Sequence, residues 1–398
     1  TIQNNNVYGM ISAENGIVEN HGIIQNNGNN GLFAQTGGTA INHSDGIIRN
    51  VGNYGMFAVG DANTAVVINH GLIENTIGYG MTGSNLNGIA INNGTVKNKG
   101  TIGMYGRKGI AVNNGLIEIT GNNRRGSYAE DGGVVINNGT ILMHGLNAVG
   151  MFADRGSTII NQGTITLDGT GTGMSAANGS HIILGAGSVI NIGALTRTHD
   201  GTETSADGFF IKIDSTSDVN NQGALVSDTR LTIDGTGKFV LSSSTGSLSA
   251  RRLTLRSNLY IGTEKTMDSS ENQYKVNNIN VEEIIGEGSI VSNSPLFTAR
   301  IQATEDNNHT VMMERQSFND VVSGDLGVVL EKNYNNSENN EKQNKVYNSL
   351  KSVTDEKTFL TAEKELTGDS LVNNQTYQLF NQDKIISNGI DKLMDRRT

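Results

Sequence analysis

The sequence predicts an all-β protein: a right-handed parallel β-helix of about 24 residues per coil, then a strand-rich C-terminal cap and a short amphipathic helical tail. Three observations predict it. An Asn-x-Gly motif recurs at a nearly constant interval, a Gly-Met-aromatic motif recurs in phase with it, and the composition suits tight turns, with 51 Gly, one Pro and no Cys or Trp.

The first repeat has the form apolar–Asn–x–Gly–x–apolar, as in residues 68–73, 91–96 and 112–117. Seven of its glycines follow one another at intervals of 24, 25, 23, 21, 24 and 24 residues, and they are Gly22, Gly46, Gly71, Gly94, Gly115, Gly139 and Gly163. The units lack helical apolar spacing, which excludes leucine-rich and ankyrin repeats. Their short β-branched runs predict two or three strands per coil, stacked in parallel at about 4.8 Å per coil.

Stacking of successive coils assigns roles to the repeated side chains. We expect one interior aliphatic column to consist of Ile68, Ile91, Val112, Ile136, Ile160 and Ile190, and another of Ile73, Val96, Ile117, Ile141 and Ile165. The repeated asparagines predict a ladder of side-chain hydrogen bonds at a turn, formed by Asn42, Asn69, Asn92, Asn113, Asn137 and Asn161. We call these six residues the amide ladder.

The regular repeat weakens after Gly223, and the sequence predicts three segments: β-helix repeats over 1–230, a β-rich cap over 231–316 and an α-helical linker over 317–398. In the cap we expect strands at 231–234, 238–241, 252–255, 258–261, 274–281, 288–291, 296–303 and 309–313. In the linker, helical faces are predicted for Val322, Leu326, Val329 and Leu330, for Val346, Leu350 and Val353, and for Ile386, Ile390, Leu393 and Met394.

The order of an Asn-Gly-rich solenoid, a strand-rich cap, the segment Ser-Phe-Asn-Asp-Val-Val (317–322) and a helical tail resembles type V secretion (autotransporter) passengers. The repeats are most similar to those of large fusobacterial outer-membrane adhesins. The resemblance implies a C-terminal stem portion of a passenger, with 231–316 as an autochaperone-like junction and the tail leading to an outer-membrane β-barrel of the same polypeptide. Because the chain starts at Thr1 without Met, we expect an interior segment, with the binding tip upstream.

The function that this resemblance implies is a non-enzymatic cell-surface adhesin segment. The expected partners are host-cell or bacterial surface proteins or glycans, bound in virulence or biofilm formation. The expected location is extracellular, on a Gram-negative cell surface and anchored in the outer membrane. We expect a monomer. We also expect no binding of nucleic acid, because the formal net charge is −10 and phosphate binding needs a basic stripe.

The candidate ligand-binding residues form one position of the second repeat, which we call the aromatic column: Phe33, Phe57, Tyr105, Tyr128 and Phe152. They stand next to a second repeated position that holds Met56, Met104 and Met151. Neighbours on a strand face opposite ways, so one of the two columns lies outside. An exposed aromatic column could bind a glycan or a protein. Alternatively, the rings turn inward, with Met at a corner.

A carbohydrate-cleaving β-helix, such as a polysaccharide lyase or glycosidase, is the alternative function. The best candidate for a catalytic pair of carboxylates is Glu130-Asp131. We expect this pair to lie in a solvated loop beside arginines, so no catalytic residue is assigned. His21, His43 and His70 share the x position of Asn-x-Gly and could bind a metal if stacked. Because Asn or Gln fills this position in later coils, a polar ladder is expected, with no metal and no cofactor.

Overall fold

A computed structural model describes residues 1–74, 76–169, 171–185, 187–192, 209–213, 216–263, 273–304, 308–322, 324–334, 346–347, 349–351, 353 and 356–367. The chain forms two compact units. The first comprises residues 1–261, 275–291 and 301–311, and the second comprises 262–274, 292–300 and 312–398.

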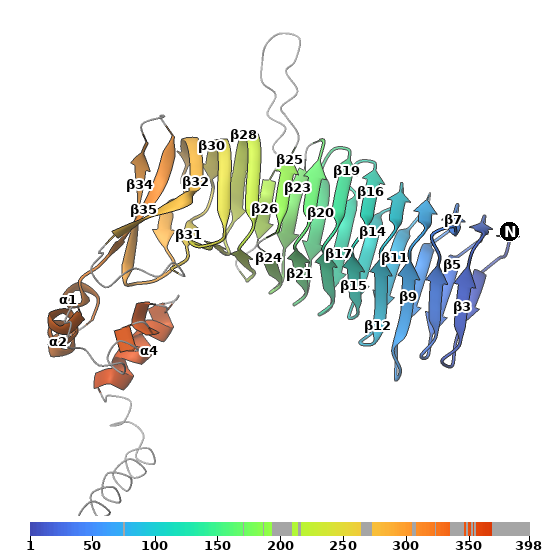
Figure 1. Cartoon of the computed structure of the whole chain (residues 1–398), viewed down its shortest axis with the longest axis horizontal. Helices are drawn as coiled ribbons and strands as arrows, with labels where there is room; N and C mark the ends of the chain where they lie inside the picture. Colours follow the sequence, from blue (N-terminus) through green and yellow to red (C-terminus); the bar gives the residue numbers. More distant parts are fainter. Residues whose placement is uncertain are drawn as a thin grey trace, which may run out of the picture. The chain divides into compact units, whose positions relative to one another are not determined.

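The first unit confirms the predicted fold class, a parallel β-solenoid of about 10 coils with about 24 residues per coil. Each regular coil contains three short strands separated by turns, and Figure 1 shows the coils stacked side by side along the solenoid. Each strand pairs in parallel with the equivalent strand of the next coil. The strands therefore form three columns.

The first column consists of β2 (Tyr8–Ser12), β5 (Asn30–Gln35), β8 (Tyr54–Val59), β11 (Tyr79–Ser84), β14 (Ile102–Arg107), β17 (Arg125–Glu130), β20 (Ala148–Ala153), β23 (Gly171–Ala176) and β26 (Phe209–Ile213). The second consists of β3 (Ile17–Asn20), β6 (Thr39–Asn42), β9 (Ala65–Asn69), β12 (Gly88–Asn92), β15 (Ile110–Asn113), β18 (Val134–Asn137), β21 (Thr158–Asn161), β24 (His181–Leu184), β27 (Asp218–Asn221), β29 (Lys238–Leu241) and β31 (Leu259–Ile261). The third consists of β1 (Ile2–Gln3), β4 (Ile23–Gln25), β7 (Ile47–Arg49), β10 (Leu72–Glu74), β13 (Thr95–Asn98), β16 (Leu116–Thr120), β19 (Thr140–His144), β22 (Thr164–Leu167) and β25 (Val189–Ile192).

The predicted aliphatic column of Ile73, Val96, Ile117, Ile141 and Ile165 lies in the third strand column and is fully buried. Its residues pair directly from coil to coil. Ile190 continues this column, because it pairs with Ile165, and not the other column as expected.

The other predicted interior column is wrong. Ile68, Ile91, Val112, Ile136 and Ile160 are in register from coil to coil, but their side chains lie on the outer face and are only half-buried. The reason is the alternation of side chains along a strand. The next residue in each strand is a fully buried Asn, so the inward aliphatic positions are one residue earlier: Val67, Ala90, Ala111, Val135, Ile159 and Ile182.

A column of glycines lies near the start of the first-column strands, one residue after the chain arrives from the third strand column. A Cβ atom on Gly103 would lie 2.5 Å from the carbonyl oxygen of Gly126 in the next coil and 2.5 Å from Cγ2 of Ile117. Gly55 and Gly80 have the same surroundings. The Gly of the second repeat is therefore required by close approach of backbone to the aliphatic column.

Parallel pairing continues across residue 230. The long strand β28 (Ala224–Gly235) pairs with both β25 and β26, so one strand takes the place of two strands and their corner. The strands β30 (Ser247–Leu255) and β32 (Gln273–Gly286) continue this stack. The last copy of the second repeat is Gly173-Met174 in β23, and β26, the next strand of this column, already lacks it. The strand β33 (Ile290–Ser292) follows β31 in the sheet of the second column, and the remaining strands are β34 (Phe297–Ala303) and β35 (His309–Arg315).

The second unit contains the helices α1 (Phe318–Val321), α2 (Gly324–Tyr334) and α4 (Glu356–Thr367). Its core is aromatic: the rings of Phe318, Tyr334 and Tyr347 lie with centroids 5.4–5.8 Å apart. Leu330 is buried, as expected, but Val329 is 54% exposed, so the predicted helical face is only partly correct.

The face predicted for Ile386, Ile390, Leu393 and Met394 lies outside the described residues. Among the helices that the structure describes, none combines the length and apolar character needed to cross a membrane.

Candidate functional site

The aromatic column lies on the outer face of the first strand column, and the neighbouring methionines point into the core. Met56, Met104 and Met151 are fully buried. The rings stack on one another along the solenoid, with centroid distances of 5.2–5.4 Å for Phe33–Phe57, Tyr105–Tyr128 and Tyr128–Phe152. Tyr8, Tyr54 and Tyr79 complete the stack.

Stacking conceals most of these rings although they lie outside the core. Phe33, Tyr105 and Tyr128 are only 7–8% exposed, because each ring face packs against the ring of a neighbouring coil. The guanidinium of Arg125 lies 4.7 Å from the ring centroid of Tyr128 and 4.6 Å from that of Phe152, within the range of a cation–π contact. The column therefore presents ring edges, rather than free faces, to a ligand.

The amide ladder is buried at the ends of the second-column strands. The side-chain nitrogen of each Asn donates to the side-chain oxygen of the next at 2.7–2.8 Å, from Asn42 to Asn161. Asn20 begins the ladder and Ser188 ends it. The same nitrogens also donate to the carbonyl of the Gly two residues on, or, for Asn42, four residues on. The Asn-x-Gly repeat is thus explained by structure alone.

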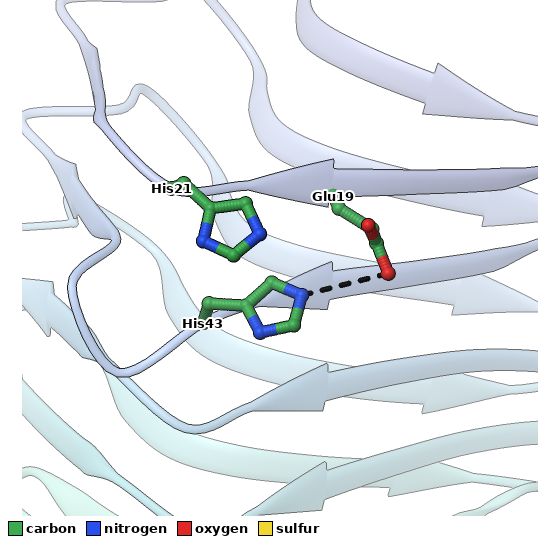
Figure 2. Close-up of side chains that lie close together, drawn as sticks. All are labelled: Glu19, His21 and His43. Atoms are coloured by element: carbon green, nitrogen blue, oxygen red, sulfur yellow. Dashed lines mark ion pairs between the residues drawn. The ribbon is translucent and has the colours of Figure 1, made fainter.

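The x position of Asn-x-Gly forms a second, exposed ladder. Asn138 donates to Asn114, and Asn114 to Asn93, each at 2.8 Å. In the first coils the same position holds His21 and His43, whose imidazole rings stack with centroids 3.9 Å apart. Glu19 lies beside them, with an oxygen 3.5 Å from Nε2 of His43 (Figure 2).

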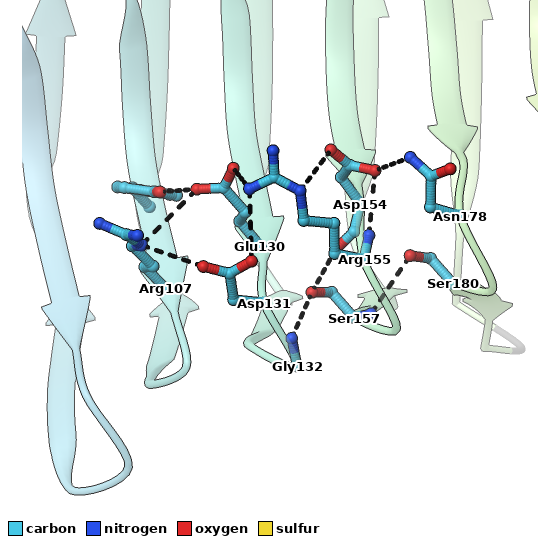
Figure 3. Close-up of polar contacts among 10 residues, drawn as sticks. Arg107, Glu130, Asp131, Gly132, Asp154, Arg155, Ser157, Asn178 and Ser180 are labelled. Carbon is cyan, nitrogen blue, oxygen red and sulfur yellow. Dashed lines mark hydrogen bonds and ion pairs between the residues drawn. The ribbon is translucent and has the colours of Figure 1, made fainter.

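The pair Glu130-Asp131 belongs to an ion-pair network over three coils (Figure 3). Arg155 lies 2.8 Å from the Glu130 carboxylate and 3.3 Å from that of Asp131, and Arg107 lies 3.2 Å from Asp131. The hydroxyl of Tyr105 donates to Glu130. Burial, together with this carboxylate, raises the pKa of Tyr105. Burial acts to raise the pKa of Asp131, but the two arginines outweigh it and lower that pKa.

A third surface was not predicted from the sequence. The outer face of the second strand column carries two aligned rows of β-branched residues, half-buried or exposed. They are Val66, Ile89, Ile110 and Val134, and Ile41, Ile68, Ile91, Val112, Ile136, Ile160 and Ile183. The signal in the sequence is the unbroken apolar run, as in 89–91 and 134–136, because a strand apolar on both faces does not alternate.

One comparison identifies a related segment. The family model of the BigA beta sandwich domain matches residues 234–317, the strand-rich part that follows the regular coils. Neither the curated proteins nor the solved structures give a match to this chain. The β-solenoid and the BigA-like segment together fit a surface-exposed bacterial protein with an adhesin-like role.

Proposed function

We propose that this chain is the rigid, non-enzymatic stem of an autotransporter-type adhesin of the fusobacterial kind, anchored in the outer membrane. The stem carries an adhesive region away from the cell toward host or bacterial surface proteins or glycans. The observation that supports it best is the continuous amide ladder, in register over seven coils from Asn20 to Asn161 and followed by the BigA-like segment.

The energetics of the coils favour a spacer. Each coil repeats the same buried aliphatic, glycine and asparagine positions, so stability is a sum of similar coil-to-coil interfaces. At about 4.8 Å per coil, about 10 coils extend roughly 48 Å. Such a stack resists bending because each coil is hydrogen-bonded to its neighbours along all three strand columns.

The BigA-like segment suits the role of a folding junction at the end of the stack. The open end of a solenoid exposes unpaired strand edges and an apolar core, and a distinct terminal structure protects both. We propose that residues 231–316 form first after export and serve as the template on which the coils add.

The contacts of Glu130 and Asp131 favour this function over a carbohydrate-cleaving one. A glycoside hydrolase needs one protonated carboxyl group and one free carboxylate on either side of the scissile bond. Here both carboxylates are paired with arginines, and the pKa of Asp131 is lowered rather than raised.

Removal of two whole coils tests the stem. Deletion of residues 93–137 joins Asn92 to Asn138 and preserves the order of the repeat. In the bacterium that produces this chain, we expect the shortened protein to be displayed, as shown by antibody labelling of intact cells, and to support adhesion as the parent does. Loss of adhesion with normal display would instead place the binding surface on these coils, and absence of the parent protein from the cell surface would refute the function.

A further inference from the structure

The first two coils bring together two histidines and one glutamate. Glu19 lies near the end of β3 and His21 directly after it, whereas His43 directly follows β6 in the next coil. Asn20 pairs with Asn42, so His21 and His43 occupy the same position of successive coils. One ligand atom from each of the three residues lies within 4.8 Å of the others. Figure 2 shows a nitrogen of each ring on the side of the Glu19 carboxylate.

One nitrogen of this cluster lacks a hydrogen bond. Nε2 of His43 is buried and has no hydrogen-bond partner among the described residues, although an oxygen of Glu19 lies 3.5 Å from it. A buried polar atom without a partner is costly unless a ligand or ion binds it. Two imidazole nitrogens and one carboxylate oxygen are a donor set that Zn²⁺ accepts.

The partner of His21 orients that ring for binding. Nδ1 of His21 lies 3.1 Å from the Asp45 carboxylate. The tautomer with its proton on Nδ1 donates to this carboxylate and leaves the Nε2 lone pair available to an ion. A carboxylate behind a histidine ligand is the usual outer-shell arrangement of zinc sites, because it fixes the tautomer and makes the ligand nitrogen more basic.

We propose that Glu19, His21 and His43 form a zinc site that joins the first two coils, with a fourth position open to water. Zn²⁺ at about 2.0–2.1 Å from each Nε2 needs these nitrogens about 3.3 Å apart. The two rings stack with their planes only 11° apart, so their nitrogen lone pairs are nearly parallel. Both rings must therefore rotate about their side-chain torsions before the nitrogens converge on one ion, and the 58% exposed side chain of His21 leaves room for this rotation. The ion also balances the charges of Glu19 and Asp45.

The chain supplies fold-preserving variants and a control. Asn occupies the histidine position in later coils and forms hydrogen bonds there, so His21→Asn and His43→Asn suit the solenoid. His144 also lies beside two carboxylates, 2.5 Å from Asp168 and 3.7 Å from Glu118, but it is not part of the three-residue cluster. His144→Asn is therefore the matched control.

Calorimetric titration of the untagged full chain with zinc chloride at neutral pH tests the site. We expect one Zn²⁺ per chain. His21→Asn and His43→Asn each remove a zinc ligand and should weaken zinc binding at least about 10-fold. Asp45→Asn removes the group that orients His21 and should weaken zinc binding about 10-fold. His144→Asn should leave the affinity unchanged.

Cobalt gives a second readout, since Co²⁺ in the same site should show visible absorption bands that His43→Asn removes. The proposal is overturned if the parent chain takes up no zinc. It is equally overturned if His21→Asn and His43→Asn bind as the parent does, or if His144→Asn weakens binding as much, with circular dichroism confirming that every variant is folded.

Discussion

Substitution of Asn113 by Ala removes one rung from the middle of the amide ladder. Asn113 is fully buried. Its side chain accepts a hydrogen bond from Asn92 at 2.7 Å and donates to Asn137 at 2.7 Å and to the Gly115 carbonyl at 3.1 Å. The substitution leaves a donor on one side and an acceptor on the other without their partners.

The expected cost follows from these unpaired groups. A buried polar group left without its partner costs about 1–3 kcal/mol. The nitrogen of Asn92 keeps weaker contacts, at 3.3 Å, to the carbonyls of Gly94 and Leu116, which reduces the penalty on that side. We therefore expect the free energy of unfolding to fall by about 2–4 kcal/mol.

The neighbouring residue provides the control. Asn114→Ala removes the same atoms one residue away, but its hydrogen bonds to Asn93 and Asn138 are exposed and water can replace them. Its expected cost is within about 0.5 kcal/mol. Urea unfolding followed by circular dichroism measures both variants. Equal losses for Asn113→Ala and Asn114→Ala would refute the view that burial makes this ladder a source of stability.

Three further predictions follow from packing and charge. Ile141→Ala, in the buried column, should lower the free energy of unfolding by about 2–5 kcal/mol in the same urea assay. Ile136→Ala, on the outer face, should lower it by about 1 kcal/mol or less. Equal losses would contradict the assignment of inner and outer faces. Gly103→Ala should destabilise the solenoid by about 1–3 kcal/mol because its Cβ meets backbone, whereas Gly22→Ala, with open space around it, should be tolerated. A hydrogen bond from its arginine partner lowers the pKa of Glu331 below its ordinary value of 4.5, so its stabilisation is present above that pH and is lost as the pH falls through the lowered value. Glu331→Gln should therefore lower the melting temperature of the helices at pH 7 and weaken its decline in acid; an unchanged acid profile would contradict this.

The periodicity of the sequence predicted the solenoid well, because one coil repeats the same constraints as the next. Each Asn-x-Gly copy marks the same buried strand end, and each glycine of the second motif marks the same close approach of backbone to the aliphatic column. It was harder to predict which residues of each strand face the core. Val135 and Ile136 are equally apolar, and only the inward position of Asn137 shows which of them faces the core.

The candidate sites depended on rotamers and long-range register that a sequence does not specify. The repeated aromatic residues indicated a column, but not that Tyr105 and Tyr128 would cover each other face to face. Glu130 and Asp131 looked like a loop beside arginines 124 and 125, whereas their partners Arg107 and Arg155 come from the coils on either side. Coil stacking makes residues about 24 apart into neighbours.

Distances between spin labels along one column test most directly whether the coils stack in register. The chain has no Cys, so a thiol-reactive spin label attaches only to the two cysteines that are introduced for each measurement. Label pairs at His21 with Asn114, Asn138 or Gln162 span four, five and six coils. Double electron–electron resonance should give label-to-label distances of about 19, 24 and 29 Å, which is a rise of about 4.8 Å per coil. Distances that do not increase with the number of coils would contradict the stacked solenoid and the stem built on it.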